Sequence, residues 1–177
     1  AQRQLRKQGL GVHDTLAHLQ RLREGLAEHR QHRFFPAIQT LAHAVLETAE
    51  ALPELPHLAD HLVHGDPKIS NLVFDTHTGE GICMIDLDTL AYMPLPLEMG
   101  DAFRSWCNPK GENSQAALFR LDYFEAALYG YAESAAGSVE PAEWRSFVTA
   151  TRRIMVELAA RFTLDALNES YFGWDAE

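Results

Sequence analysis

The residues best suited to take part in a chemical reaction lie in one short segment, residues 64–71, which reads His-Gly-Asp-Pro-Lys-Ile-Ser-Asn. Asp66 and Asn71 stand five positions apart with Lys68 between them, and Asp86 follows fifteen positions after Asn71. Phosphoryl transfer needs a carboxylate to take the proton of the attacking hydroxyl, oxygen ligands for magnesium, and a cation beside the transferred group. These residue types, in this order, predict that chemistry.

Two short apolar segments would bring the distant members of this set together. Residues 71–74 and 82–86 have the composition of strands, and the residues between them are rich in turn-forming types. Because an antiparallel hairpin places its two ends about 5 Å apart, Asn71 and Asp86 are expected to share one hard cation, which suits magnesium. The sequence leaves two roles open for Asp88: a further metal ligand, or a strand-end carboxylate that accepts backbone hydrogen bonds.

Helical patterns flank this hairpin on both sides. Apolar residues recur every three or four positions there, which is typical of amphipathic helices. Asp14 or Thr15 is placed to cap the first helix and Pro141 to open the last, while two prolines predict a loop over residues 90–99. The expected helices span residues 12–30, 36–52, 100–107, 114–136 and 142–169. The sequence therefore predicts an α+β fold that is mainly helical, with a small β-hairpin carrying the metal site.

The motif and the strand after it resemble the aminoglycoside phosphotransferase and choline kinase family, whose catalytic loop begins His-Gly-Asp where protein kinases have His-Arg-Asp. The resemblance rests on residues 63–75, residues 82–88 and the helical framework. It implies the large, C-terminal lobe of a protein-kinase-like fold and an ATP-dependent phosphotransferase. Residues 85–89, followed by Gly100 and Asp101, are similar to N-acetylhexosamine kinases and other sugar kinases, which implies a sugar or amino sugar as the small-molecule acceptor.

The same resemblance implies a catalytic set and a support for it. Asp66 would be the catalytic base, Lys68 would face the transferred phosphate, and His64 would brace the loop. Asp101 would anchor the catalytic loop from a following helix.

The resemblance also implies magnesium ligands at Asn71 and Asp86 and ATP as the phosphate donor. In this family the lobe that grips most of the nucleotide is N-terminal and carries a five-stranded sheet and a glycine-rich loop. Neither feature is visible in residues 1–63, so residues 1–177 are expected to be the C-terminal catalytic lobe alone. The surface left uncovered around the hairpin and the first helix is expected to favour self-association.

Two other function classes stand beside this hypothesis. The chain could be a non-catalytic, pseudokinase-like binding or scaffolding module, although a scaffold has no need for an intact metal constellation. A metal-dependent hydrolase would use the same acidic cluster but would need a second set of metal ligands. Arg104 and Lys110 follow Asp101 and are expected to lie on solvated surface rather than at a phosphate.

Composition narrows the remaining possibilities. A formal net charge of −10 argues against nucleic acid as a partner and removes any electrostatic attraction to an anionic membrane. The two cysteines lack the spacing of a zinc site or a disulfide scaffold, which favours a reducing compartment. No apolar stretch reaches the length of a membrane span, and the polar, basic residues 1–7 do not resemble a signal peptide. The expected location is the cytoplasm.

Overall fold

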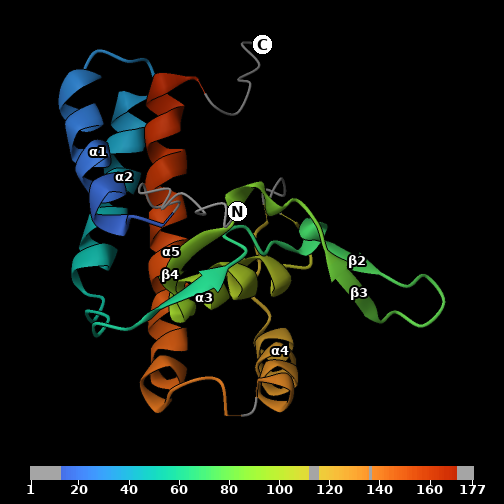
Figure 1. Ribbon diagram of the computed structural model, residues 1–177. Coiled ribbons are helices and arrows are strands. Elements are labelled where there is room, and N and C mark those ends of the chain that lie inside the picture. Colours follow the sequence, from blue (N-terminus) through green and yellow to red (C-terminus); the bar gives the residue numbers. More distant parts are fainter. Residues whose placement is uncertain (1–12, 112–115, 136, 171–177) are drawn as a thin grey trace, which may run out of the picture. The chain divides into compact units, whose positions relative to one another are not determined.

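The computed structural model describes residues 13–111, 116–135 and 137–170, drawn as ribbons in Figure 1. The described residues fall into two compact units. One consists of residues 55–151, and the other of residues 13–54 together with residues 152–170. The longest helix, α5 (Pro141–Asn168), begins in the first of these units and ends in the second.

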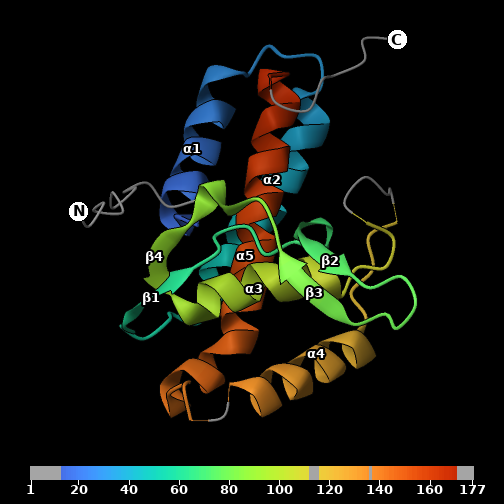
Figure 2. The ribbon, with the colours of Figure 1, turned by 45° about the vertical axis from the view of Figure 1, so that its right-hand side comes forward.

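The second unit is built from three helical segments that run alongside one another in Figure 2: α1 (Thr15–Glu28), α2 (Phe35–Glu50) and the C-terminal part of α5. The predicted cap of the first helix is confirmed, because the Asp14 side chain accepts the backbone N–H of Ala17 at 3.0 Å. Apolar residues at helical spacing meet between the three segments to form one core, made of Leu19, Leu22, Ala42, Val45, Leu52, Val156 and Ala160.

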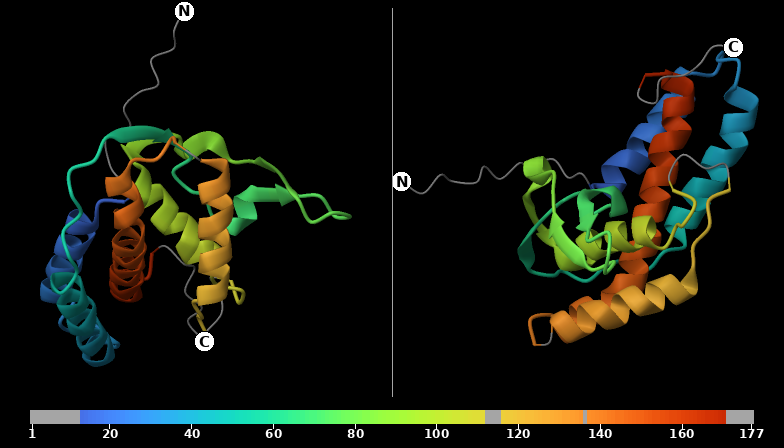
Figure 3. Two further views of the ribbon diagram at one scale, coloured as in Figure 1. Left: turned by 90° about the horizontal axis from the view of Figure 1, so that it is seen from below. Right: turned by 90° about the vertical axis from the view of Figure 1, so that its right-hand side faces the viewer.

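The first unit contains two small antiparallel sheets. Strand β2 (Leu72–Phe74) pairs with β3 (Gly81–Met84), which confirms the predicted hairpin. The hairpin projects away from the helices of its unit in Figure 3, and most of its residues are exposed. The other sheet pairs β1 (Asp60–Val63) with β4 (Ala91–Pro94). Short 3-10 helices, η1 (Ile69–Asn71) and η2 (Leu87–Thr89), lie between these strands.

The predicted loop over residues 90–99 is wrong. The first half of this segment is strand β4, and α3 (Leu95–Trp106) begins immediately after it. Both prolines occupy positions that regular structure tolerates, because Pro94 ends an edge strand and Pro96 lies in the first turn of the helix, where no backbone N–H is needed. The sequence prediction treated the prolines as breakers and so began this helix five residues late.

Helix α3 is the centre of its unit. Its residue Phe103 is fully buried and packs against aromatic rings of α4 (Leu121–Ser134) and α5. A Cβ at Gly100 would lie 2.9 Å from the backbone of Ala150 on α5, so the absence of a side chain lets the two helices approach closely.

The mainly helical α+β class is therefore confirmed. The helices and the hairpin follow one another in the predicted order, but several begin or end at other residues than predicted. Pro141 opens α5 as predicted. The expected helix limits at Val12, Ser114 and Ala136 fall outside the described residues. None of the helices in the described part of the chain is both long and apolar enough to cross a membrane.

Candidate active site

The predicted catalytic loop leaves β1 at a turn that only glycine can make. Gly65 has a φ of 84°, and a Cβ there would lie 2.2 Å from the carbonyl oxygen of Thr89. The Thr89 hydroxyl donates a hydrogen bond to the carbonyl oxygen of His64 at 2.9 Å. The start of the loop is thus packed directly against the end of η2.

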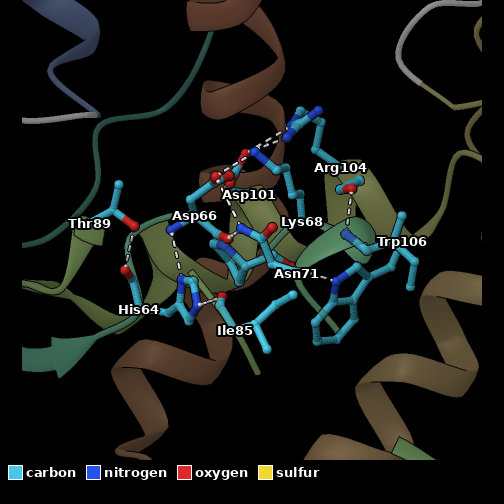
Figure 4. Close-up of polar contacts among 12 residues, drawn as sticks. His64, Asp66, Lys68, Asn71, Ile85, Thr89, Asp101, Arg104 and Trp106 are labelled. Carbon is cyan, nitrogen blue, oxygen red and sulfur yellow. Dashed lines mark hydrogen bonds and ion pairs between the residues drawn. The ribbon is translucent and has the colours of Figure 1, made fainter. Parts of the chain in front are cut away.

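The imidazole of His64 joins the loop to the strand β3 side of the site (Figure 4). Its Nε2 donates to the carbonyl oxygen of Ile85 at 2.8 Å, and its Nδ1 accepts the backbone N–H of Asp66 at 3.3 Å. Both ring nitrogens are therefore used, which sets the tautomer and the ring orientation. The buried ring ties the residue preceding Asp86 to the loop that carries Asp66.

Glu98, in the first turn of α3, holds the start of the same loop by accepting two backbone hydrogen bonds. Its Oε1 accepts the backbone N–H of His64 and its Oε2 that of Gly65, both at 3.0 Å. The residue is only 7% exposed, and burial raises the pKa of its carboxyl group while the two backbone hydrogen bonds act to lower it. The sequence prediction missed Glu98 because it assigned residues 90–99 to a loop. The available signal was an acidic residue shortly after a proline, which is typical of a first helical turn.

The side chains of Asp66, Lys68 and Asn71 converge, as Figure 4 shows. The Lys68 ammonium donates to Asp66 Oδ2 at 2.7 Å, and the Asn71 amide donates to the same oxygen at 3.2 Å and to the Asp66 carbonyl oxygen at 2.9 Å. Asp66 Oδ2 thus has two donors, whereas Oδ1 receives no hydrogen bond from the described residues. The Asp66 side chain keeps 26% of its surface exposed, so a ligand can reach it.

Asp86 lies just after the other strand of the hairpin, at the start of η2. The backbone N–H of Ile85 donates to the carbonyl oxygen of Asn71 at 2.9 Å, so Asp86 directly follows the residue paired with Asn71. Asp86 adopts a left-handed conformation with φ 66° and ψ 61°, a costly state for a residue with a side chain and one that clusters at functional sites. Its exposed carboxylate has no hydrogen-bond partner among the described residues.

These positions bear on metal binding. The Asn71 amide nitrogen is occupied as a donor, which leaves the amide oxygen as the atom able to ligate a cation. That oxygen and the Asp86 carboxylate are the ligand types that magnesium prefers. Asp88 is exposed within η2. Across the described residues no group of three or more His, Cys, Asp or Glu side chains is arranged to hold a metal by itself, so any ion here needs further oxygens from a ligand or water.

The C-terminal turn of α3 holds the middle of the catalytic loop. The Ser105 hydroxyl accepts the backbone N–H of Ile69 at 3.0 Å, and the Trp106 indole donates to the carbonyl oxygen of Pro67 at 2.7 Å. These two contacts lie on either side of Lys68 in the chain. These contacts of Ser105 and Trp106 were not predictable from the sequence, since contacts to a distant backbone leave no local pattern.

Asp101 also lies on α3 and is 4% exposed. Its Oδ1 accepts hydrogen bonds from Arg104, with the Nη2 atom at 2.8 Å. The expectation that Arg104 lies on solvated surface is wrong, because its side chain is only 16% exposed in this ion pair. Lys110 is exposed, as expected. The backbone N–H groups at the start of the loop are held by Glu98, and the role of Asp101 as the loop anchor stays a prediction.

The chain matches the model of a known protein family. The model of the phosphotransferase enzyme family matches residues 3–136, which is more than half of the chain. The matched range includes the whole loop, the hairpin and helix α3.

Proposed function

We propose a specific role for this chain, which belongs to the phosphotransferase enzyme family: it carries the catalytic site for moving the γ-phosphate of ATP to a hydroxyl of a small molecule. One observation carries the proposal most directly. Asp66 has one carboxylate oxygen held by two donors and the other open, beside a hairpin whose paired strands are flanked by Asn71 and Asp86. That combination meets the needs of phosphoryl transfer.

Asp66 acts as the base in this proposal. Lys68 and Asn71 fix the orientation of its carboxylate, so Oδ1 can accept the proton of an acceptor hydroxyl lying next to it. Lys68 also supplies a positive charge close to the position of the transferred phosphate. His64 holds the loop and the hairpin at a constant separation through its two ring nitrogens.

Asn71 and Asp86 would hold magnesium, with Asp88 as a candidate third ligand. Magnesium held there would offset the negative charge that develops during transfer. The protein's contribution is to present two oxygen ligands from the two ends of the hairpin, Asn71 just before β2 and Asp86 just after β3, with Asp86 kept in the left-handed conformation.

The chain is proposed to be the C-terminal lobe of the kinase. In support, the sheets found among the described residues have two strands each, and neither matches the five-stranded sheet that grips the nucleotide in this family. A sugar or amino sugar is the proposed acceptor, on the resemblance of residues 85–89 with Gly100 and Asp101 to sugar kinases.

The first test is catalytic. The 177-residue chain is assayed for ADP release with ATP, magnesium and a panel of sugars, amino sugars, choline and aminoglycosides, beside the Asp66→Asn variant. We expect slow, acceptor-dependent turnover that the variant loses, because one lobe provides only part of the nucleotide site and general-base catalysis contributes about 10²–10⁴ in rate. Equal turnover by Asp66→Asn would remove Asp66 from the role of base.

The second test is metal binding, which does not depend on turnover. Manganese is added to ¹⁵N-labelled chain, and the broadening of amide signals in the hairpin is compared between wild type, Asp86→Ala and Asp60→Ala. Asp60 is an exposed aspartate on β1 and serves as the matched control. Broadening near Asn71 should weaken in Asp86→Ala alone. Metal binding without any turnover would instead favour the pseudokinase-like module.

A further inference from the structure

The second unit contains a surface hollow whose lining residues precede the catalytic loop in the sequence. It is a groove of about 350 Å³ between α1 and α2, within the size range of small-molecule sites. Residues of α1 three and four positions apart form one wall, and residues of α2 four positions apart form the other, so each helix turns one face to the groove. The lining residues are Arg23, Leu26, Ala27, Arg30, Phe35, Gln39 and His43.

The charge of this lining contrasts with that of the whole chain. The chain carries a formal net charge of −10, yet among the described residues no carboxylate lines the groove, and Arg23, Arg30 and His43 do. The side chains of Arg30 and His43 make no ion pair or hydrogen bond with any other described residue. Arg23 reaches Glu50 only at 3.4 Å, with both side chains well exposed, so this pair is weak and a stronger anion can replace it.

The start of α2 adds positive potential at the same place. Phe35, the first residue of α2, lines the groove. The preceding residue, Phe34, provides no side-chain hydrogen bond to cap the helix, and the first turn contains no acidic residue. The first turn of α2 therefore places the positive end of the helix dipole at the groove with no acidic side chain of its own to offset it, which favours an anion there.

The rest of the lining is apolar. Leu26, Ala27 and Phe35 offer surface that could cover the carbon skeleton of a ligand, while Gln39 supplies an amide group. Two guanidinium groups and a histidine suit a dianionic phosphate better than a single carboxylate, because their combined charge is at least +2 and the guanidinium fork matches phosphate oxygens.

We propose that the groove between α1 and α2 binds a small phosphate monoester with an apolar body. This inference goes beyond the proposed catalytic function and does not depend on it, because none of the groove residues belongs to the catalytic loop or the hairpin.

The test uses phenyl phosphate as the probe and phenol as its uncharged counterpart. Both are titrated into the full ¹⁵N-labelled chain, and backbone and arginine side-chain signals are followed. Phenyl phosphate should cause saturable shifts at Arg30, Gln39 and His43, and phenol should cause none at the same concentration. Inorganic phosphate should bind more weakly than phenyl phosphate, because it leaves the apolar surface uncovered.

Two arginine variants make the test specific. Arg30→Gln should weaken phenyl phosphate binding about tenfold or more, the loss of one charge-assisted hydrogen bond. Arg33→Gln is the matched control, since Arg33 lies outside the groove, pairs with Glu169 at 2.6 Å and should leave binding unchanged. Arg30 is exposed, so its replacement should not prevent folding, which circular dichroism checks. Shifts that do not saturate, equal binding by Arg30→Gln, or shifts confined to residues 64–71 would each overturn the proposal.

Discussion

Replacing Glu98 with glutamine tests whether α3 holds the catalytic loop through one buried carboxylate. In the wild type, each oxygen of Glu98 accepts one backbone N–H, from His64 and from Gly65, at 3.0 Å. A glutamine keeps the size of the side chain but offers only one oxygen. Its NH₂ group must then face one of the two N–H groups, so one buried donor loses its partner.

The magnitude follows from this count. A buried donor left without a partner costs about 1–3 kcal/mol, and the remaining hydrogen bond loses its charge assistance. The wild-type carboxylate is itself penalised by burial, which raises its pKa, so part of this loss is offset when the charge is removed. We therefore expect Glu98→Gln to favour opening of the loop by roughly 2 kcal/mol, an increase of about 30-fold in amide exchange there.

The assay is hydrogen exchange followed by NMR, residue by residue. Exchange should accelerate at His64 and Gly65, while Ile69, whose N–H is held by Ser105, should be affected far less. Glu125→Gln on the exposed side of α4 is the control and should change stability by less than about 0.5 kcal/mol. Unchanged exchange at His64 and Gly65 in a folded Glu98→Gln protein would refute the argument that this carboxylate positions the loop.

Four further predictions each concern a single residue. Asp86→Gly should stabilise the chain by about 0.5–1 kcal/mol in denaturant unfolding, because glycine accepts the left-handed conformation freely, yet should abolish manganese broadening in the hairpin; lower stability would contradict the strain argument. Gly65→Ala should lower the free energy of unfolding by roughly 2–4 kcal/mol, because its Cβ meets the Thr89 carbonyl oxygen; a stability close to wild type would show that the turn can relax. Burial lowers the pKa of His18 below its ordinary value of 6.5, so the unfolded chain binds more protons, and stability should fall as the pH drops below 6.5. His18→Gln should flatten that fall in thermal denaturation, and an identical pH profile would exclude His18 as its source. Ile82 is 61% exposed on β3, so sedimentation should detect self-association of the chain that Ile82→Lys reduces; a monomer at all concentrations would contradict it.

Local patterns in the sequence were enough to predict several elements. The hairpin was predictable because two apolar segments flank a turn-rich linker, and the pairing of Leu72 with Met84 follows from that local closure. The cap at Asp14 and the opening of α5 at Pro141 depend on the residue and its near neighbours only. The expected nearness of Asn71 and the end of the second strand has the same local origin.

Tertiary structure decided the features that depend on distant residues. Residues 60–63 and 91–94 become strands by pairing with each other. They lie so far apart in the chain that no periodic pattern in the sequence indicates this pairing. The two prolines of residues 90–99 fit a strand end and a first helical turn only once that pairing exists.

The contacts that support the catalytic loop also depend on residues far apart in the sequence. Glu98, Ser105 and Trp106 act on backbone groups more than thirty positions earlier in the chain. A hydrogen bond to a backbone atom places no demand on the type of the partner residue, so it leaves no trace in the partner's sequence. The sequence by itself therefore predicted which residues are candidates for the chemistry, and the folded chain decided which residues hold the loop that carries them.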